Sequence, residues 1–413
     1  MEGWGGISSE EMAVIDENSE WLGVPRTLLM ENAGSSIARI VYEWLGGLSG
    51  KKVTVFAGTG NNGGDGMAAA RHMAGMGAKV TVILVGGEAK TPEASMNLRI
   101  IEGMRDSINI IKVRNVEELV RVRDSIEDSE AVVDALLGTG VRGRIREPLR
   151  TAISIINSLK AIRVSVDIPS GVNPDTGQIL DIAVEANITV TLHRPKKGLP
   201  SAQDYVGDVV VAPIGIPPEA EYVMGPGDAR RAFRAMRGQR RVVMTDDRDV
   251  REWLKEFHVP CAEKYESREE SVILLGRGEE PPRDENVIVV SEGLREDADI
   301  SIVGWDEVER MGAEDGALWE KALSVGKIAL ERNQVIYVLD KEELASDGRT
   351  HKAAWVDRPL GEEGRAALKA SILALLSCGV EPIKACAAAG YLAGVAEKRG
   401  LNGLKAEIGR LAR

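Results

Sequence analysis

The chain has little of several residues on which common structural and catalytic sites depend. Cysteine occurs only at Cys261, Cys378 and Cys386, and this small odd number argues against a disulfide framework and favours reduced core residues. The four histidines lie far apart in the sequence, so no local spacing supports a zinc site. Aromatic residues make up only 4% of the chain while glycine is abundant, which fits helices packed closely on a parallel sheet.

Basic charge and long apolar runs are also scarce. The chain has 64 acidic and 52 basic residues, and its net charge of −12 disfavours nucleic acid as a partner, because proteins that bind its phosphates need a basic surface. The first residues have neither the basic start nor the apolar stretch of a signal peptide, and no apolar run is long enough to span a bilayer. We therefore expect a cytoplasmic protein with no membrane contact.

The length of 413 residues predicts two domains. In the first half, short apolar runs alternate with helical segments, as in a parallel sheet covered by helices on both faces. A proline-rich stretch, Ile214 to Pro218, marks the junction, so we expect domains at residues 1–218 and 219–413. The strands expected in the first domain are residues 53–57, 80–85, 108–113, 131–136, 163–167, 188–192 and 209–213. The second half is less regular, with strand-like runs at 241–244, 272–275, 287–290, 300–303 and 335–339 before alanine-rich helices at 365–377 and 382–398.

A glycine-rich segment, Gly58-Thr-Gly-Asn-Asn-Gly63, follows the first expected strand and precedes a helix expected from Asp65. This spacing satisfies the dinucleotide fingerprint, in which glycines let the backbone approach a pyrophosphate at a helix N-terminus. A tight turn without a ligand is the alternative. A hydride-transferring dehydrogenase also needs an acidic residue at the end of the second strand, and Val85-Gly-Gly87 stands there instead.

The wider segment Phe56-Ala-Gly-Thr-Gly-Asn-Asn-Gly-Gly-Asp-Gly66 resembles the signature of the NAD(P)H-hydrate epimerase family. Three further loops match that family in order: Asp134 to Gly140, Asp167 to Gly171 and Pro195 to Leu199. Met30-Glu-Asn-Ala-Gly34 matches its N-terminal helix, so the resemblance covers about residues 8–217. It implies an α/β fold, a Rossmann-like three-layer αβα sandwich.

The resemblance also implies where the hydrated nicotinamide nucleotide binds. The corresponding substrate-binding residues are Asn61, Asn62, Gly63, Gly64, Asp65, Gly138, Thr139, Gly140, Val141, Arg142, Gly143, Arg144 and Asp167. The two arginines offer guanidinium donors suited to phosphate, although a solvated basic turn explains them equally well.

Members of that family hold a potassium ion, and the positions that match its ligands are Asn62, Asp134 and Ser170. The resemblance therefore implies one K⁺ per subunit. All three side chains supply oxygen, as a hard cation requires, but their types do not identify the ion. Alternatively, Asp134 and Ser170 only cap helices.

The implied reaction interconverts the two epimers of hydrated NADH or NADPH through a cationic, iminium-like species. Asp167 is the expected catalytic residue, as an acid-base and electrostatic group, or it only anchors the substrate. Lys196 lies in an expected mobile loop, where it either steers phosphate or is a solvated lysine.

The second half resembles a ribokinase-like domain that, in many members of the family, dehydrates the repaired epimer with ADP or ATP. Gly225-Pro-Gly-Asp228 and Leu375 to Pro382 carry this resemblance, but the expected catalytic aspartate is replaced by Ala366. Alanine cannot take a proton from a hydroxyl. We therefore expect a degenerate, catalytically silent domain.

The leading hypothesis is an isomerase for metabolite repair that acts on hydrated NADH and NADPH and, like family members, forms a homodimer. One alternative is a bifunctional repair enzyme with an unusual dehydratase site. Another is a non-catalytic scaffold or ligand-sensing protein, which has no need for Asn62, Asp134, Ser170 and Asp167 together.

Overall fold

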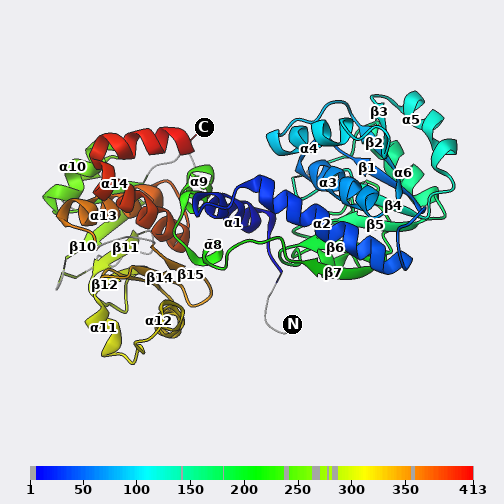
Figure 1. Cartoon of the computed structure of the whole chain (residues 1–413). Coiled ribbons are helices and arrows are strands. Elements are labelled where there is room, and N and C mark those ends of the chain that lie inside the picture. Colours follow the sequence, from blue (N-terminus) through cyan, green and yellow to red (C-terminus); the bar gives the residue numbers. More distant parts are fainter. Residues whose placement is uncertain are drawn as a thin grey trace. The chain divides into compact units, whose positions relative to one another are not determined.

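The computed structural model describes residues 6–140, 143–179, 181–236, 241–262, 270–276, 279–280, 287–354 and 359–412 (Figure 1). The chain forms two compact units. The first comprises Met1–Ala13 and Gly23–Ile216, and the second comprises Val14–Leu22 and Pro217–Arg413. The main part of the second unit begins at Pro217, close to the predicted boundary between residues 218 and 219. The second unit also includes most of α1 (Ser9–Trp21), which that predicted boundary places in the first domain.

The first unit contains one sheet of seven strands in the order β3-β2-β1-β4-β5-β6-β7. Every neighbouring pair of these strands is parallel. The strands are β1 (Lys52–Ala57), β2 (Lys79–Val85), β3 (Ile108–Val113), β4 (Ala131–Ala135), β5 (Ile162–Val166), β6 (Ile188–Leu192) and β7 (Asp208–Ala212).

Helices cover both faces of this sheet because its central strands are apolar on both sides, and β4 and β6 are buried along their whole length. One apolar core joins the sheet to α2, α3 and α4, and a second joins its other face to α5 and α6. The predicted α/β class and three-layer arrangement are confirmed. The helices and 3₁₀ turns are α2 (Arg26–Leu45), α3 (Asn61–Gly75), α4 (Pro92–Glu102), α5 (Val116–Val122), η1 (Arg123–Ile126), α6 (Leu149–Ser158), η2 (Leu199–Ser201) and α7 (Gln203–Val206).

The strand order reverses between β1 and β4, since β2 and β3 lie on one side of β1 while β5 to β7 continue beyond β4. In open parallel sheets, the two chain connections that leave the strands at such a reversal run to opposite faces of the sheet. A crevice forms between them at the carboxyl ends of the strands, and ligands bind there. The loops that follow β1 and β4 therefore meet where a ligand is expected.

The second unit contains a mixed sheet of eight strands in the order β15-β14-β13-β12-β11-β10-β8-β9. Six strands, β8 to β13, are parallel to one another. At one edge β14 pairs antiparallel with β13, and β15 pairs antiparallel with β14. The strands are β8 (Val242–Met244), β9 (Cys261–Ala262), β10 (Ser271–Leu275), β11 (Val287–Glu292), β12 (Ile300–Val303), β13 (Val335–Val338), β14 (Leu344–Ser346) and β15 (His351–Ala353). This unit is α/β as well, but its ribokinase-like origin stays a prediction.

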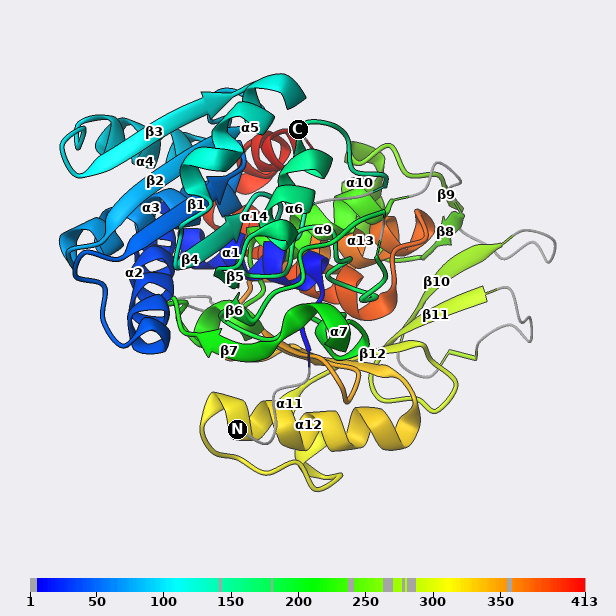
Figure 2. The ribbon, with the colours of Figure 1, turned by 90° about the vertical axis from the view of Figure 1, so that its right-hand side faces the viewer.

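Helices lie on both faces of the second sheet too (Figures 1 and 2). A large core joins it to α9, α10, α13 and α14, and a smaller one joins the opposite face to α11 and α12. The helices are α8 (Glu219–Tyr222), α9 (Pro226–Ala235), α10 (Arg248–Glu256), α11 (Trp305–Glu309), α12 (Leu318–Arg332), α13 (Glu362–Ser377) and α14 (Pro382–Leu411). Within the described residues, no helix is long and apolar enough to cross a bilayer.

A buried polar network explains why Val14–Leu22 belongs to the second unit. Asn18 is fully buried and donates to Asp228 Oδ2 at 3.1 Å and to the carbonyl of Val223 at 3.3 Å. Lys352 lies 3.0 Å from the other oxygen of Asp228. Removing one member of such a set leaves a buried polar group or charge without its partner, which costs several kcal/mol.

A second buried pair lies on β13 and just before β14. Tyr337 donates to Glu343 Oε2 at 2.5 Å, and both residues are fully buried. Burial raises the pKa of Glu343 from 4.5 to about 7, although the hydrogen bond from Tyr337 and the charge of Arg365 oppose the shift. The folded state therefore holds this proton more tightly than the unfolded state does.

We predict that the stability of the second unit falls as pH rises from about 4.5 to about 7, because only the unfolded chain releases the Glu343 proton easily over that range. The loss amounts to about 3 kcal/mol of unfolding free energy. Glu343→Gln should flatten this dependence in chemical unfolding measured at several pH values. Glu342→Gln, at the exposed neighbour, should keep the wild-type slope, and an unchanged slope in Glu343→Gln would contradict the assignment.

Candidate active site at the strand ends

The glycine-rich segment after β1 is the first turn of α3, which begins at Asn61 rather than at the predicted Asp65. Gly60 precedes the helix, and its carbonyl accepts from the Gly64 N–H at 3.1 Å. A Cβ on Gly63 would lie 2.0 Å from the carbonyl oxygen of Gly58. Only glycine permits this approach, and the chain can therefore turn from β1 into α3 within a few residues.

The loops after β1 and β4 touch each other. A Cβ on Gly138 would lie 3.3 Å from the Cβ of Asn62. Asn62 and Asp65 are each 8% exposed, and Nδ2 of Asn62 is buried with no hydrogen-bond partner among the described residues. A buried amide N–H that lacks an acceptor in the protein is suited to donating a hydrogen bond to a ligand.

Asp134, near the end of β4, is a fully buried carboxylate. Its Oδ1 accepts from the Ser170 hydroxyl at 2.6 Å and the Leu136 N–H at 3.3 Å. Its Oδ2 accepts from the Ser165 hydroxyl and the Ser170 N–H, both at 2.8 Å. No helix starts at Asp134 or Ser170, so the alternative that they cap helices is wrong. They tie the ends of β4 and β5 together.

Burial raises the pKa of Asp134 above its ordinary value, although the hydrogen bonds from Ser170 and Ser165 act in the opposite direction. Among the described residues no lysine, arginine or histidine forms an ion pair with it. A buried carboxylate with no cationic partner, bonded to a serine hydroxyl, fits a hard cation. The residues present are therefore compatible with an alkali ion.

Asp167 follows β5 in a left-handed backbone conformation, with φ of 66°. Few residues other than glycine adopt this conformation, and such positions often occur at functional sites. Its Oδ1 accepts from the Leu192 N–H at 3.1 Å and lies 2.5 Å from Nζ of Lys196. Lys196 is 1% exposed, so both predictions for it are wrong: it is neither solvated nor directed at a phosphate from a mobile loop.

The other predicted substrate-binding positions follow β4. Thr139 is half-buried, while Gly140, Gly143 and Arg144 are exposed. The Arg144 side chain is 83% exposed, and its Nε lies 3.9 Å from Asp181. Val141 and Arg142 lie outside the described residues. The structure thus brings Gly138 close to Asn62 but turns Arg144 toward solvent.

The sequence did not single out Ser165. It sits inside the apolar run of β5, is fully buried and donates to Asp134. A serine within a buried apolar strand needs a hydrogen-bond partner, and this could have indicated Ser165 from the sequence.

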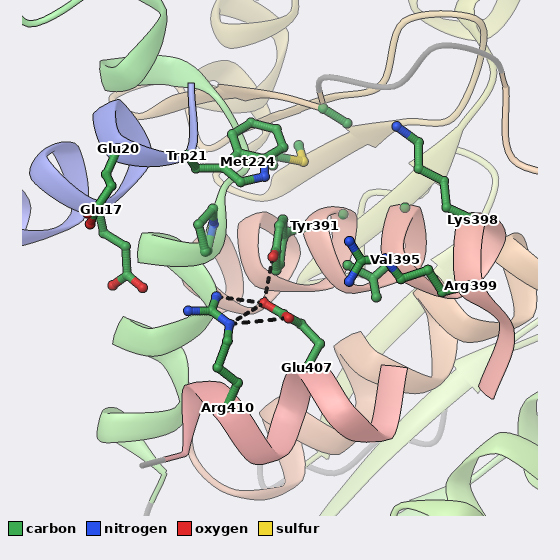
Figure 3. Close-up of a pocket in the computed structure, with 14 residues that line it drawn as sticks. Glu17, Glu20, Trp21, Met224, Tyr391, Val395, Lys398, Arg399, Glu407 and Arg410 are labelled. Atoms are coloured by element: carbon green, nitrogen blue, oxygen red, sulfur yellow. Dashed lines mark hydrogen bonds and ion pairs between the residues drawn. The ribbon is translucent and has the colours of Figure 1, made fainter. Parts of the chain in front are cut away.

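A separate cavity of about 530 Å³ lies in the second unit (Figure 3). Tyr391 donates to Glu407 at 2.7 Å, and Arg410 pairs with the same carboxylate at 2.6 Å. The ring of Trp21 meets that of Tyr391 edge-on at 6.0 Å. None of the predicted site residues lines this cavity.

Comparisons with known proteins agree with the geometry of the first unit. A family model described as "YjeF-related protein N-terminus" matches residues 26–198. An NAD(P)H-hydrate epimerase from Cenarchaeum symbiosum is 44% identical over 217 residues, which are 52% of this chain and 97% of that protein. The chain belongs to the NAD(P)H-hydrate epimerase family.

Two further proteins are similar to this chain. A bifunctional NAD(P)H-hydrate repair enzyme from Pyrobaculum aerophilum is 49% identical over 224 residues, or 54% of this chain. The match spans less than half of that relative, 44% of its length. A ribokinase-like superfamily protein from Enterococcus faecalis covers 87% of this chain and aligns over 86% of its own length, with 9% identity and a TM-score of 0.21. That similarity is too low to define the fold of the second unit.

We predict that Gly63→Ala disrupts the epimerase-family loop, because the added methyl group would overlap the Gly58 carbonyl. The variant should lose about 1–3 kcal/mol of stability. Gly75→Ala, at the other end of α3, is the control, since nothing lies within 4 Å of its Cβ. It should be neutral or stabilising by about 0.5–1 kcal/mol. Equal thermal midpoints for the two variants would contradict the close approach at Gly63.

Proposed function

We propose that the first unit is an NAD(P)H-hydrate epimerase, an isomerase that equilibrates the R and S forms of hydrated NADH and NADPH. The observation that supports this most strongly is the bond between Ser170 and Asp134 beside the reversal of strand order, where the loop after β4 also approaches Asn62 through Gly138. Asp167 follows β5, the adjacent strand. The printed names of the relatives from Cenarchaeum symbiosum and Pyrobaculum aerophilum concern the same substrate.

In this proposal Asp167 stabilises positive charge on the nicotinamide ring. Protonation of the hydroxyl on the hydrated carbon lets it leave as water and produces an iminium-like cation. Addition of water to either face, with loss of the same proton, produces either epimer. A fixed carboxylate beside that ring stabilises the cation electrostatically and exchanges a proton with the departing or returning oxygen. Oδ1 of Asp167 already accepts from Leu192 and faces Lys196, so Oδ2 is the oxygen available to the substrate.

We propose that one potassium ion per subunit is held by Asn62, Asp134 and Ser170. When bound, the ion supplies a positive charge that offsets the buried Asp134 carboxylate. The protein's own contribution is the network that places these oxygens, because Ser170 bridges Asp134 and Leu137. The segments after β4 and β5 are thereby held together. Subunit pairing as a homodimer and a cytoplasmic location stay predictions.

We further propose that the second unit has no dehydratase activity. Ala366 lies within α13, which begins at Glu362. The Arg365 N–H donates to the carbonyl of Gly361 at 3.0 Å, and the Gly361 N–H donates to the carboxylate of Glu397 at 3.1 Å. The Gly361 N–H, one of the backbone donors at this helix N-terminus, thus already bonds a carboxylate of the protein, where a phosphate would otherwise be expected.

The cavity beside Ala366 is also acidic. Its volume is about 390 Å³, and five of the eight described residues that line it are carboxylates. These are Asp249, Glu252, Glu256, Glu362 and Glu363. A nucleotide phosphate placed there meets like charge, which disfavours binding. This arrangement favours the epimerase over the bifunctional alternative, and the intact Asn62, Asp134, Ser170 and Asp167 set favours it over a scaffold.

We predict that the purified protein converts one pure hydrate epimer into the equilibrium mixture, followed by chromatography in the presence and absence of potassium. Asp167→Asn should lower kcat by about 100-fold or more with little effect on hydrate binding. Asp204→Asn, at an exposed position on α7, should react like the wild type. Conversion no faster than the spontaneous rate in the wild type would eliminate the epimerase, whereas full activity in Asp167→Asn would remove only that residue from the mechanism.

For the second unit, we predict no recovery of reduced-nicotinamide absorbance when ADP or ATP is added to the hydrate mixture. The enzyme from Pyrobaculum aerophilum serves as the positive control. Absorbance that recovers at an enzymatic rate, and in proportion to the concentration of this protein, would show that the second unit is active.

A further inference from the structure

Lys196 is the least exposed lysine at the strand ends, and its ammonium group is surrounded by acceptors. Its Nζ lies 2.5 Å from Asp167 Oδ1, 3.0 Å from the Leu192 carbonyl, 3.2 Å from the Arg194 carbonyl and 3.4 Å from the Thr191 hydroxyl. An ammonium has three N–H donors, and the four acceptors occupy all of them. Lys196 therefore has no donor left for a substrate.

The contacts of Asp167 are uneven between its two oxygens. Oδ1 receives both the Leu192 N–H and the Lys196 ammonium. The described residues give Oδ2 no hydrogen-bond or ion-pair partner, and the Asp167 side chain keeps 12% of its surface exposed. One oxygen is thus fixed by the protein, and the other has no partner among the described residues.

The backbone around Lys196 is held in place by the N-terminal segment of the first unit. Ile7 pairs with Lys196 in a short parallel bridge. The Ile7 N–H donates to the Pro195 carbonyl at 2.8 Å, and the Lys197 N–H donates to the Ile7 carbonyl at 3.0 Å. Ile7 itself is 2% exposed. The lysine is therefore fixed at both its backbone and its ammonium.

We propose that Lys196 is a positioning residue for the reaction: its ammonium holds Oδ1 of Asp167 and so presents Oδ2 to the hydrated nicotinamide ring. This inference rests on the proposed epimerase function. Lys196 offsets the charge of the carboxylate and sets its direction without touching the substrate. A carboxylate that loses this support can rotate away, and small misplacements of a catalytic group reduce rates strongly.

A double-mutant cycle tests this role, with Lys196→Met, Asp167→Asn and the combined variant measured for epimerisation of a pure hydrate epimer. Lys196→Met should lower kcat by about 100-fold while KM changes little. Because Lys196 acts through Asp167, the combined variant should be no slower than Asp167→Asn alone. Lys197→Met is the matched control, since Lys197 is exposed and pairs with Glu11, and it should keep the wild-type rate.

Unfolding midpoints of the same variants provide a readout that does not depend on activity. Lys196→Met leaves a buried carboxylate without its cation, so its midpoint should fall, and adding Asp167→Asn should restore part of the loss. Wild-type kcat in Lys196→Met, losses that multiply in the combined variant, or additive midpoints would each overturn the role of Lys196. An inactive wild type with coupled midpoints would instead locate the failure in the proposed epimerase function.

Discussion

The site depends on one buried charge, the Asp134 carboxylate at the end of β4. Moving a carboxylate out of water is costly, and this one has no cationic side chain beside it among the described residues. Four hydrogen bonds offset part of that cost, and they come from Ser165, Leu136 and, twice, Ser170. The same bonds that stabilise the charge hold the ends of β4 and β5 in register. Stability and the shape of the site therefore have a common origin.

The carboxylate of Asp167, which follows the adjacent strand β5, is stabilised in a different way. Asp167 has Lys196 as its counter-charge, and that lysine is itself secured by backbone carbonyls. In our proposal a potassium ion balances the first carboxylate, whereas the second is paired with a lysine of the protein. The close approach of Gly138 to Asn62 brings the loops after β1 and β4 together at the reversal of strand order. This division fits a site that treats the nicotinamide nucleotide as substrate rather than as a hydride carrier.

Much of the first unit could be predicted from the sequence because its strands are short apolar runs and its loops carry several motifs in order. The residues Asn62, Asp134 and Ser170 were predicted as ion ligands in this way, and the structure shows that Ser170 bonds Asp134. The start of α3 was misplaced by four residues, since Asn-Asn-Gly-Gly is a poor helix former that tertiary contacts nevertheless hold in a helical turn. The burial of Lys196 was missed because lysine near a glycine usually faces solvent. Its contact with Asp167 is a long-range interaction that no local pattern encodes.

The second unit shows the limit of motif reasoning, because a loose resemblance locates Ala366 but cannot show that Glu397 accepts from the N–H at the start of its helix.

For the first unit, the central claim is that Asp134 is balanced by an alkali ion bound with Asn62 and Ser170. The most direct measurement is anomalous diffraction from crystals of the wild type and Asp134→Asn with rubidium in place of potassium. We predict a peak among the oxygens of Asn62, Asp134 and Ser170 that vanishes in the variant. No peak in the wild type, or an equal peak in both proteins, would contradict the account.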